Sequence, residues 1–349
     1  MANTKIPPEL VDDQVFGRRN IIINGDMRVA QRATSVTSQT AGVAIHTVDR
    51  FYTELSGATV DVAQVTDAPT GYQYSQKVTM NGAFSASASQ YVIPFETRIE
   101  GNELQRLSYG TSNAKKLTLS FWIKSSKTGT YTVEFSNNNS GGGKKSSSQY
   151  TISSANTWEH KTLTWVGDTS TAFEGSTAAE LLIYFWAVAG TTYTSGTSPQ
   201  GNSWDVGTSA NRAAGVSGSA ADDDYWAMTG VQLEVGDQAT PFEYRSIGEE
   251  LALCQRYFLK CDVPCYGQGE FQVSAYTTKA VMTVQFPVEM RVAPTVTNSY
   301  TNRDNTASLA TQGLTNSIMK QGVNLNATIN LVSYPYCYFD YTGSMDAEI

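Results

Sequence analysis

The chain has 349 residues, of which only 16% are charged, and a formal net charge of −8. This length is enough for two domains, each with its own core, and the negative charge opposes adsorption to a phosphate backbone, so we expect no nucleic-acid partner. The longest apolar run, residues 181–189, is far shorter than the roughly 20 residues of a membrane span, so we expect no membrane insertion. The 19 Tyr and 13 Phe favour an all-β extracellular or virion protein over a metabolic enzyme.

Residues 1–20 form an N-terminal arm of low hydrophobicity that cannot fold by itself. It is either a disordered tail or an anchor that orders on a larger assembly or on sister chains. The arm lacks the basic start and apolar core of a secretory signal, so we expect assembly in a cytoplasm. As an anchor, its candidate contact residues are Lys5, Ile6, Pro7, Pro8, Leu10, Val15 and Phe16.

Residues 21–243 are predicted to form the first β-domain. Ile21 to Ile23 lead into Asn24-Gly25, a strong signal for a tight turn. Apolar and polar residues then alternate in 117–123 and in 131–135, which predicts strands that each bury one face.

Two further strands are predicted in this domain. Residues 158–166 read as one of them, and 180–189 are apolar on both faces, as in a central strand with cover on either side. Short antiparallel strands without a long helix favour a jelly-roll-like β-sandwich.

Two long polar segments interrupt these strands. Residues 136–149 contain three consecutive glycines and predict a flexible loop, and 190–224 is a long segment without clear structure. The second carries Tyr193 and Trp204. Aromatic faces stack on sugar rings, so these two are candidate glycan-binding residues; the alternative is that they pack against the sandwich or a sister chain.

The chain offers few residues for catalysis or metal binding. Asp222, Asp223 and Asp224 could bind calcium through their oxygens or simply be solvated. Neither His46 nor His160 has the context of a zinc hydrolase, and no nucleophile elbow occurs. We therefore expect no enzyme and no cofactor. Buried structural thiols are the preferred interpretation of the cysteines, over a disulfide, a reactive thiol or a metal site: Cys254, Cys261, Cys265 and Cys337.

The junction in 231–260 joins a strand to a short helix. Val231, Leu233 and Val235 alternate with polar residues as in a half-buried strand, and Pro241 stiffens the connector. Ser246 and Glu249 have the spacing of a capping box. The linking helix, 244–260, is predicted to bury one face made of Ile247, Leu251, Cys254 and Phe258, with Glu249, Glu250 and Arg256 elsewhere.

Residues 261–349 predict a second, smaller β-domain. Alternation marks strands at 271–275, 280–286 and 325–331, and two prolines within 286–297 bound the strands there. An aromatic terminal strand follows at 334–341, either a tip contact or a core edge.

Several of these segments resemble virion structural proteins of tailed bacteriophages. The motifs are VQLEVGDQATPFEYRSIGEELALCQRYF from Val231, IIINGDM from Ile21, VAQR from Val29, VDRF from Val48 and FPVEMRVAPTVT from Phe286. They are similar to tail-fibre β-sandwiches related to carbohydrate-binding modules and to C-terminal fibre modules. The resemblance covers roughly residues 20–60 and 225–300, under half of the chain, and carries over architecture but no site.

The resemblance implies a non-enzymatic short tail fibre or tail appendage that binds a host-surface glycan. Its implied partners are other virion proteins, a tail adaptor or nozzle or the capsid, contacted through the arm, and its implied assembly is a homotrimer on the virion. One alternative is a head fibre or capsid-decorating protein. Another, of a different class, is a glycan-active enzyme or its accessory binding module, because two carboxylates can come from distant strands.

Overall fold

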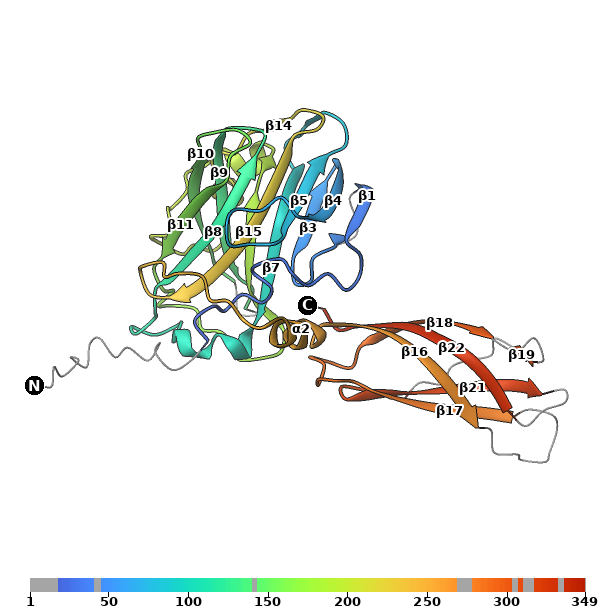
Figure 1. The fold of residues 1–349 in the computed structure, drawn as a ribbon. Coiled ribbons are helices and arrows are strands. Elements are labelled where there is room, and N and C mark those ends of the chain that lie inside the picture. The colour runs from blue at the N-terminus through green and yellow to red at the C-terminus, as the bar shows by residue number, and fades with distance from the viewer. Residues whose placement is uncertain are drawn as a thin grey trace, which may run out of the picture. The chain divides into compact units, whose positions relative to one another are not determined.

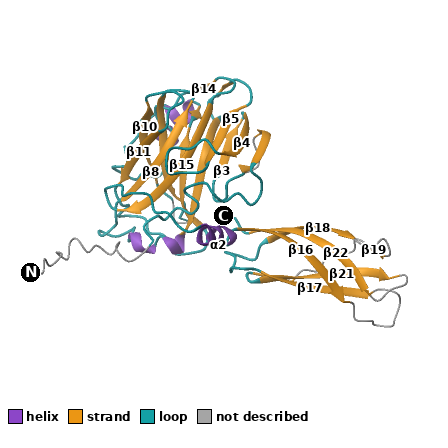
Figure 2. Ribbon diagram, in the orientation of Figure 1, coloured by secondary structure: helices purple, strands orange, loops and turns teal. Residues whose placement is uncertain are grey.

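The computed structural model describes residues 18–40, 45–139, 143–268, 278–302, 307–309, 317–331 and 336–348. The predicted all-β class is confirmed: antiparallel sheets are the main regular structure of these residues, and the helices are short (Figure 2). The chain divides into two compact units, Met1–Ile247 and Gly248–Ile349. Among the described residues, no helix has the length and apolar character needed to cross a membrane.

Two antiparallel sheets form the sandwich of the first unit (Figure 1). The six-stranded sheet has the order β1 (Ser35–Thr40), β4 (Thr59–Val65), β5 (Ser75–Met80), β15 (Tyr225–Val235), β8 (Leu117–Ser125), β11 (Glu159–Trp165). The seven-stranded sheet has the order β10 (Lys145–Ile152), β9 (Gly129–Asn137), β12 (Ala179–Trp186), β7 (Tyr91–Glu100), β3 (Tyr52–Ser56), β2 (Ile45–His46), with β13 (Val188–Ala189) on β7. A small pair joins β6 (Phe84–Ser85) to β14 (Ser219–Ala220).

The core of this unit lies between the two sheets and is rich in aromatic rings. Phe121 from one sheet meets Phe185 from the other edge-on, with ring centroids 5.1 Å apart, and Phe135 stacks on Trp165 at 3.9 Å. All four are buried. Aromatic side chains bury large apolar areas, so the inward-facing rings supply much of the free energy that holds the two sheets together.

The predicted strands at 117–123, 131–135, 158–166 and 180–189 are all present, as β8, β9, β11, and β12 with β13. The expectation that the first two bury only one face is wrong, because Thr118 of β8 and Glu134 of β9 are also buried. Chain segments outside the strands cover these outward positions, and they supply hydrogen-bond partners to the polar side chains there.

The expected loop at 136–149 is largely a hairpin. β9 ends at Asn137, β10 begins at Lys145, and the two strands pair in register from Ser136 to Gly129. The serines of β10 are buried, and Ser147 donates to the carbonyl of Asn211 at 2.8 Å. A polar strand is stable here because another segment accepts its hydroxyl hydrogens.

The segment predicted to lack clear structure, 190–224, has local structure of its own. It contains the short helices α1 (Thr191–Thr194) and η5 (Ser209–Asn211) as well as β14. The part from 190 to 216 is here called the covering segment. Its residues near Ala214 lie on the outer face of the seven-stranded sheet, and its middle follows the edge of β10, where Asp205 bridges Lys145. Ala214 illustrates the attachment, since its carbonyl accepts from Thr132 Oγ1 at 3.0 Å and from Gln149 Nε2 at 2.6 Å.

β15 is a central strand, and both of its faces are covered at the junction. Gln232 and Glu234, predicted to face solvent, are buried. The connector after β15 folds back over them: the Thr240 amide donates to Glu234 Oε1 at 2.8 Å, and the Glu243 amide donates to Gln232 Oε1 at 2.8 Å. The side chains of β15 therefore replace water as partners for the connector's backbone.

The segment around Asn24-Gly25 lies beside β15, in the place that β5 leaves. The turn is confirmed, since the Met27 amide donates to the Asn24 carbonyl at 3.0 Å. The Gly25 carbonyl accepts from the Val231 amide of β15 at 2.8 Å, so the turn packs against a strand that is distant in the sequence. A Cβ on Gly25 would lie 2.1 Å from the Val231 oxygen, so glycine permits this close backbone approach.

The second unit begins within α2 (Ile247–Gln255), at Gly248, and contains two further sheets. One has the order β16 (Phe258–Gln268), β22 (Tyr336–Asp346), β18 (Thr295–Asn302); the other has the order β17 (Thr278–Gln285), β21 (Gly322–Leu331), β19 (Ala307–Leu309), with β20 (Ser317–Met319) on β21. The strands predicted at 280–286 and 325–331 are confirmed, and Pro287 and Pro294 lie between β17 and β18. The strand predicted at 271–275 and the start of the aromatic terminal strand lie outside the described residues.

The predicted buried face of the linking helix is wrong in its register. Cys254 is buried, but Ile247 is 53% exposed, and Phe258 belongs to β16 because the helix ends at Gln255. Glu250, which was expected to lie elsewhere, is buried. The buried face therefore follows Glu250 and Cys254, which are one i,i+4 pair.

We predict that Asn20→Ala lowers the free energy of unfolding of the chain by about 2–3 kcal/mol. Asn20 Nδ2 donates to the Val231 carbonyl at 3.1 Å, and Asn20 Oδ1 accepts from the amides of Leu233 and Ile22 at 3.1 and 3.0 Å. The substitution leaves three buried backbone groups unpaired. Urea unfolding followed by tryptophan fluorescence measures the effect; the exposed Asn102→Ala is the control, and an equal loss in both variants would contradict the prediction.

Candidate functional site

A row of polar and aromatic residues crosses the outer face of the seven-stranded sheet. Tyr52 of β3 pairs directly with Glu96 of β7, Glu96 with Tyr184 of β12, Tyr184 with Glu134 of β9, and Glu134 with Ser147 of β10. Residues directly opposite in a sheet project from the same face, so the five side chains form one line across five strands. The line carries two carboxylates, with one tyrosine between them.

The first carboxylate is paired with an arginine on its own strand. Arg98 Nε lies 2.5 Å from Glu96 Oε1, and the Arg98 guanidinium carbon lies 4.4 Å from the centroid of the Tyr52 ring. Glu96 is fully buried. Burial raises the pKa of Glu96 to about 7, with Glu54 adding to this shift and Arg98 opposing it. This carboxyl therefore holds a proton to a higher pH than an exposed glutamate does, although it lies next to a permanent cation.

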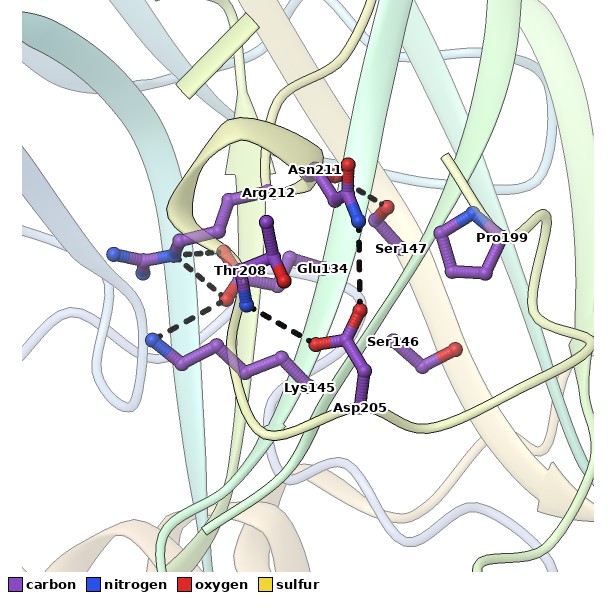
Figure 3. A pocket seen from close by; sticks show the side chains of 9 residues that line it. All are labelled: Glu134, Lys145, Ser146, Ser147, Pro199, Asp205, Thr208, Asn211 and Arg212. Atoms are coloured by element: carbon purple, nitrogen blue, oxygen red, sulfur yellow. Dashed lines mark hydrogen bonds and ion pairs between the residues drawn. The ribbon is translucent and has the colours of Figure 1, made fainter. Parts of the chain in front are cut away.

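The second carboxylate, on Glu134, is held by hydrogen bonds from Arg212 and Trp186 and forms an ion pair with Lys145; Figure 3 shows Arg212 and Lys145 beside it. Arg212 Nε donates to its two oxygens at 2.9 and 3.0 Å, Trp186 Nε1 donates to Oε2 at 2.8 Å, and Lys145 Nζ lies 3.9 Å from Oε1. Burial raises the pKa of Glu134, and Arg212 and Lys145 act against that rise. Glu134 thereby attaches the covering segment, which carries Arg212, to the sheet.

Aromatic rings gather around Arg212, and we name Tyr91, Tyr184, Trp186 and Tyr193 the aromatic cluster. The Arg212 guanidinium carbon lies 5.7, 5.0 and 5.6 Å from the ring centroids of Tyr184, Trp186 and Tyr193. Tyr91 packs edge-on against Trp186 at 5.5 Å and against Tyr193 at 5.7 Å. The three tyrosines are half-buried, whereas Trp186 is buried, so the cluster presents tyrosine surface at the margin of the covering segment.

A small pocket lies on the other side of Glu134, between β10 and the covering segment (Figure 3). Its cavity volume of about 10 Å³ corresponds to one water molecule. Asp205 in its wall accepts from the amides of Gly207 and Thr208 at 2.7 and 3.2 Å. The pocket is too small for a sugar, so it belongs to the attachment of the segment.

A larger pocket, of about 340 Å³, lies near the short helices η3 (Gly101–Glu103) and η4 (Gln105–Leu107). Tyr109 and Phe173 line it, with their rings stacked at 4.9 Å. The Tyr109 hydroxyl is buried and has no hydrogen-bond partner among the described residues, and burial raises its pKa.

The structure places the two predicted glycan-binding residues in different surroundings. Tyr193 belongs to the aromatic cluster. Trp204 packs against Tyr109 at 5.7 Å, and its Nε1 donates to the Val166 carbonyl at 2.7 Å. Trp204 thus shows the packing that was the alternative interpretation, while the glycan role of either residue stays a prediction.

Two of the predicted metal candidates bind neighbouring segments of the first unit with their carboxylates. Asp222 Oδ1 accepts from the Gly82 amide at 2.7 Å, and Asp224 Oδ1 accepts from Ser126 Oγ at 2.8 Å. No group of three or more His, Cys, Asp or Glu that could hold a metal ion occurs in the part of the chain that the structure describes. The candidate anchoring residues lie outside the described residues: Lys5, Ile6, Pro7, Pro8, Leu10, Val15 and Phe16.

The sequence patterns did not identify Arg212 or the row of residues from Tyr52 to Ser147 as parts of a site. A signal for two of them is present, since Glu96 and Glu134 each stand inside a strand-like run at positions that alternate with apolar residues. A carboxylate in the middle of a buried strand requires a partner, and strands alone do not show which arginine supplies it.

The chain matched no protein-family model and no curated protein. Solved structures with a similar fold include the enzymatically active domain of tailspike protein 4 of bacteriophage CBA120, at 14% identity and a TM-score of 0.32, covering 62% of this chain and 21% of that one. They also include a CBM4 structure, at 12% identity and 0.32, covering 61% and 98%. The CBM22-1 and GH10 modules of a Clostridium thermocellum xylanase with xylohexaose match at 10% and 0.34, covering 64% and 30%.

We predict that Glu96 makes the stability of the chain fall as pH rises from about 4.5 to 7. Its folded pKa of about 7 lies above the ordinary value of 4.5, so the folded state keeps a proton that the unfolded state releases. The stabilisation is complete below 4.5 and is lost as pH rises through 7, with a slope of at most about 1.4 kcal/mol per pH unit. Thermal unfolding of Glu96→Gln across this range should show a flatter profile than wild type, and parallel profiles would contradict the assignment.

Proposed function

We propose that the protein is a non-enzymatic virion structural protein of a tailed bacteriophage. In this proposal it is a short tail fibre or appendage that binds a host-surface glycan through the outer face of its seven-stranded sheet. The observation that carries the binding role is the row from Tyr52 to Ser147 together with the aromatic cluster. The row and three of the four cluster residues are held on paired strands, so their geometry is set before any ligand arrives, and Tyr193 lies on α1.

The chemistry of this face suits a sugar. The tyrosine rings of Tyr91, Tyr184 and Tyr193 are half-buried and can stack on the apolar face of a pyranose. The side chains of Arg98 and Arg212 are 25% and 19% exposed, and their guanidinium groups can donate to hydroxyl and ring oxygens. Stacking and directed hydrogen bonds together distinguish one sugar from another.

The virion part of the proposal is supported by the motifs of the junction and of the N-terminal segment. In the proposal the arm binds other virion proteins, a tail adaptor or nozzle or the capsid. A homotrimer would cover edge strands such as β1 and β11, which end the six-stranded sheet. A head fibre or capsid-decorating protein is the alternative that uses the same fold.

A hydrolytic alternative also has an observation in its favour. Glu96 and Glu134 pair with the same residue, Tyr184, so their backbones are roughly 10 Å apart, and burial raises the pKa of both. A glycosidase uses two carboxyl groups, one as a general acid and the other as a nucleophile or general base. Against it, both side chains are fully buried and each is paired with an arginine, which leaves neither facing a substrate.

We predict that Tyr184→Ala weakens binding of the host's envelope polysaccharide about tenfold, because one packed aromatic contact of up to about 1.5 kcal/mol is lost. Tyr225→Ala is the matched control: Tyr225 is a half-buried tyrosine of the six-stranded sheet whose ring lies 4.2 Å from Lys77 Nζ. Isothermal titration calorimetry measures both affinities. Equal affinities would move the site elsewhere, and new reducing ends during incubation would favour the hydrolytic alternative.

We predict that gold-tagged antibodies raised against residues 250–349 label the tail of intact particles in electron micrographs. A virion appendage that faces the host exposes its C-terminal unit there. Labelling over the capsid would favour the head-fibre alternative, and particles without label would argue against a virion protein.

A further inference from the structure

Arg212 follows η5 on the covering segment, and its orientation is fixed by Glu134. Its Nε donates to both carboxylate oxygens of Glu134, at 2.9 and 3.0 Å. Trp186 Nε1 holds the same carboxylate at 2.8 Å. Figure 3 shows the Nε edge of Arg212 directed at Glu134, and its two terminal nitrogens directed away from Glu134 and from the small pocket.

The two terminal nitrogens of Arg212 have no hydrogen-bond partner in the part of the chain that the structure describes. Within the described residues the only hydrogen bonds of this guanidinium are those from Nε. Neither nitrogen is a buried unpaired atom, and the side chain is 19% exposed, so both reach solvent. A guanidinium has five N–H donors, and with Nε used, four remain as a planar fork.

The surroundings of this fork favour a flat acidic group on a ring. The rings of Tyr184 and Tyr193 stand 5.7 and 5.6 Å from the guanidinium carbon, and both tyrosines are half-buried. They limit hydration of the fork, and a pyranose can lie against either ring. A carboxylate matches the fork with two parallel hydrogen bonds, which an isolated sugar hydroxyl cannot do.

Charged side chains already surround the fork before any ligand binds. Arg212 and Lys145 face Glu134 and Asp205, which acts on Lys145, and a further carboxylate, Glu54, accepts from the Tyr91 hydroxyl of the aromatic cluster at 3.0 Å. Figure 3 shows Asp205 in the wall of the small pocket, with Glu134 between it and the terminal nitrogens of Arg212. An incoming carboxylate would therefore meet the two terminal nitrogens of Arg212, while the Nε of the same guanidinium stays bonded to Glu134.

We propose that Arg212, between Tyr184 and Tyr193, binds the carboxylate of an acidic sugar. The glycan taken by the outer face of the seven-stranded sheet then carries a uronic or sialic acid. This inference rests on the proposed glycan binding and adds the chemical class of the ligand.

The test is a glycan array on which sialyllactose, hyaluronan fragments and polygalacturonate fragments are each printed beside their carboxyl-reduced forms. We expect wild type to prefer the acidic form of its ligand about tenfold or more, the scale of one charge-assisted hydrogen bond. Arg212→Lys keeps a cation beside Glu134 but removes the fork, and it should lose most of this preference. Arg106→Lys, at an arginine bonded to the Arg18 carbonyl, should keep it.

Each result bears on a different statement. Equal binding of acidic and reduced forms by wild type overturns the acidic ligand and leaves glycan binding intact. Binding to no glycan on the array overturns both. A preference that survives in Arg212→Lys overturns the role of the fork. Thermal unfolding of each variant shows whether it is folded, and the wild-type ratio tests the ligand class without any variant.

Discussion

The ion pair between Arg212 and Glu134 organises the outer face of the seven-stranded sheet. A buried carboxylate is costly to desolvate, and removing the partner of a buried ion pair costs about 3–5 kcal/mol. Glu134 therefore requires the covering segment, and the covering segment requires Glu134. The neighbouring outward positions follow the same constraint: Thr132 and Gln149 both donate to the Ala214 carbonyl, and Ser147 donates to the Asn211 carbonyl. Polar residues can be buried on these strands because the segment accepts their hydrogens.

The six-stranded sheet also buries polar side chains on its outer face, at β15. Its outward side chains Gln232 and Glu234 bind the connector, and Glu243 of the connector accepts from the amide of Asn20 at 2.8 Å. Arg245 donates to the carbonyls of Ile22 and Asn20. The start of the described chain and the end of the first unit thus meet on one central strand. Each sheet is covered by irregular backbone whose hydrogen bonds are satisfied by strand side chains.

Local patterns predicted the strands well because the alternation of apolar and polar residues in a strand can be recognised within about five to ten residues. They failed where a distant segment decides what a side chain meets. Gln232 and Glu234 read as solvent-facing because nothing in β15 shows that the connector returns over them. The serines of β10 read as a loop because polar, glycine-flanked runs are typical of loops, while their cover comes from residues about 60 positions later. The buried face of α2 was predicted wrongly because only two of its residues, Glu250 and Cys254, are buried, and two residues do not produce a clear apolar pattern.

The candidate site was harder to predict, because each part of it joins distant segments. Tyr193 was singled out for its aromatic ring in a polar segment, and it does lie in the aromatic cluster. Glu96, Tyr184 and Glu134 come from three strands that are neighbours only in the folded sheet. No spacing in the chain records that order, since β12 lies between β7 and β9 in space but after both in sequence.

The site forms where the covering segment stops. Trp186 is buried under it, and Tyr184, two residues away on the same face of β12, is left half-buried. The strands hold Tyr184 rigidly, because their other face carries core residues such as Ile183 and Phe185. The segment contributes Tyr193 and Arg212 from the opposite side. A change in the segment would therefore alter what meets a ligand and leave the packing between the sheets in place, so specificity and stability depend on different residues of this sandwich.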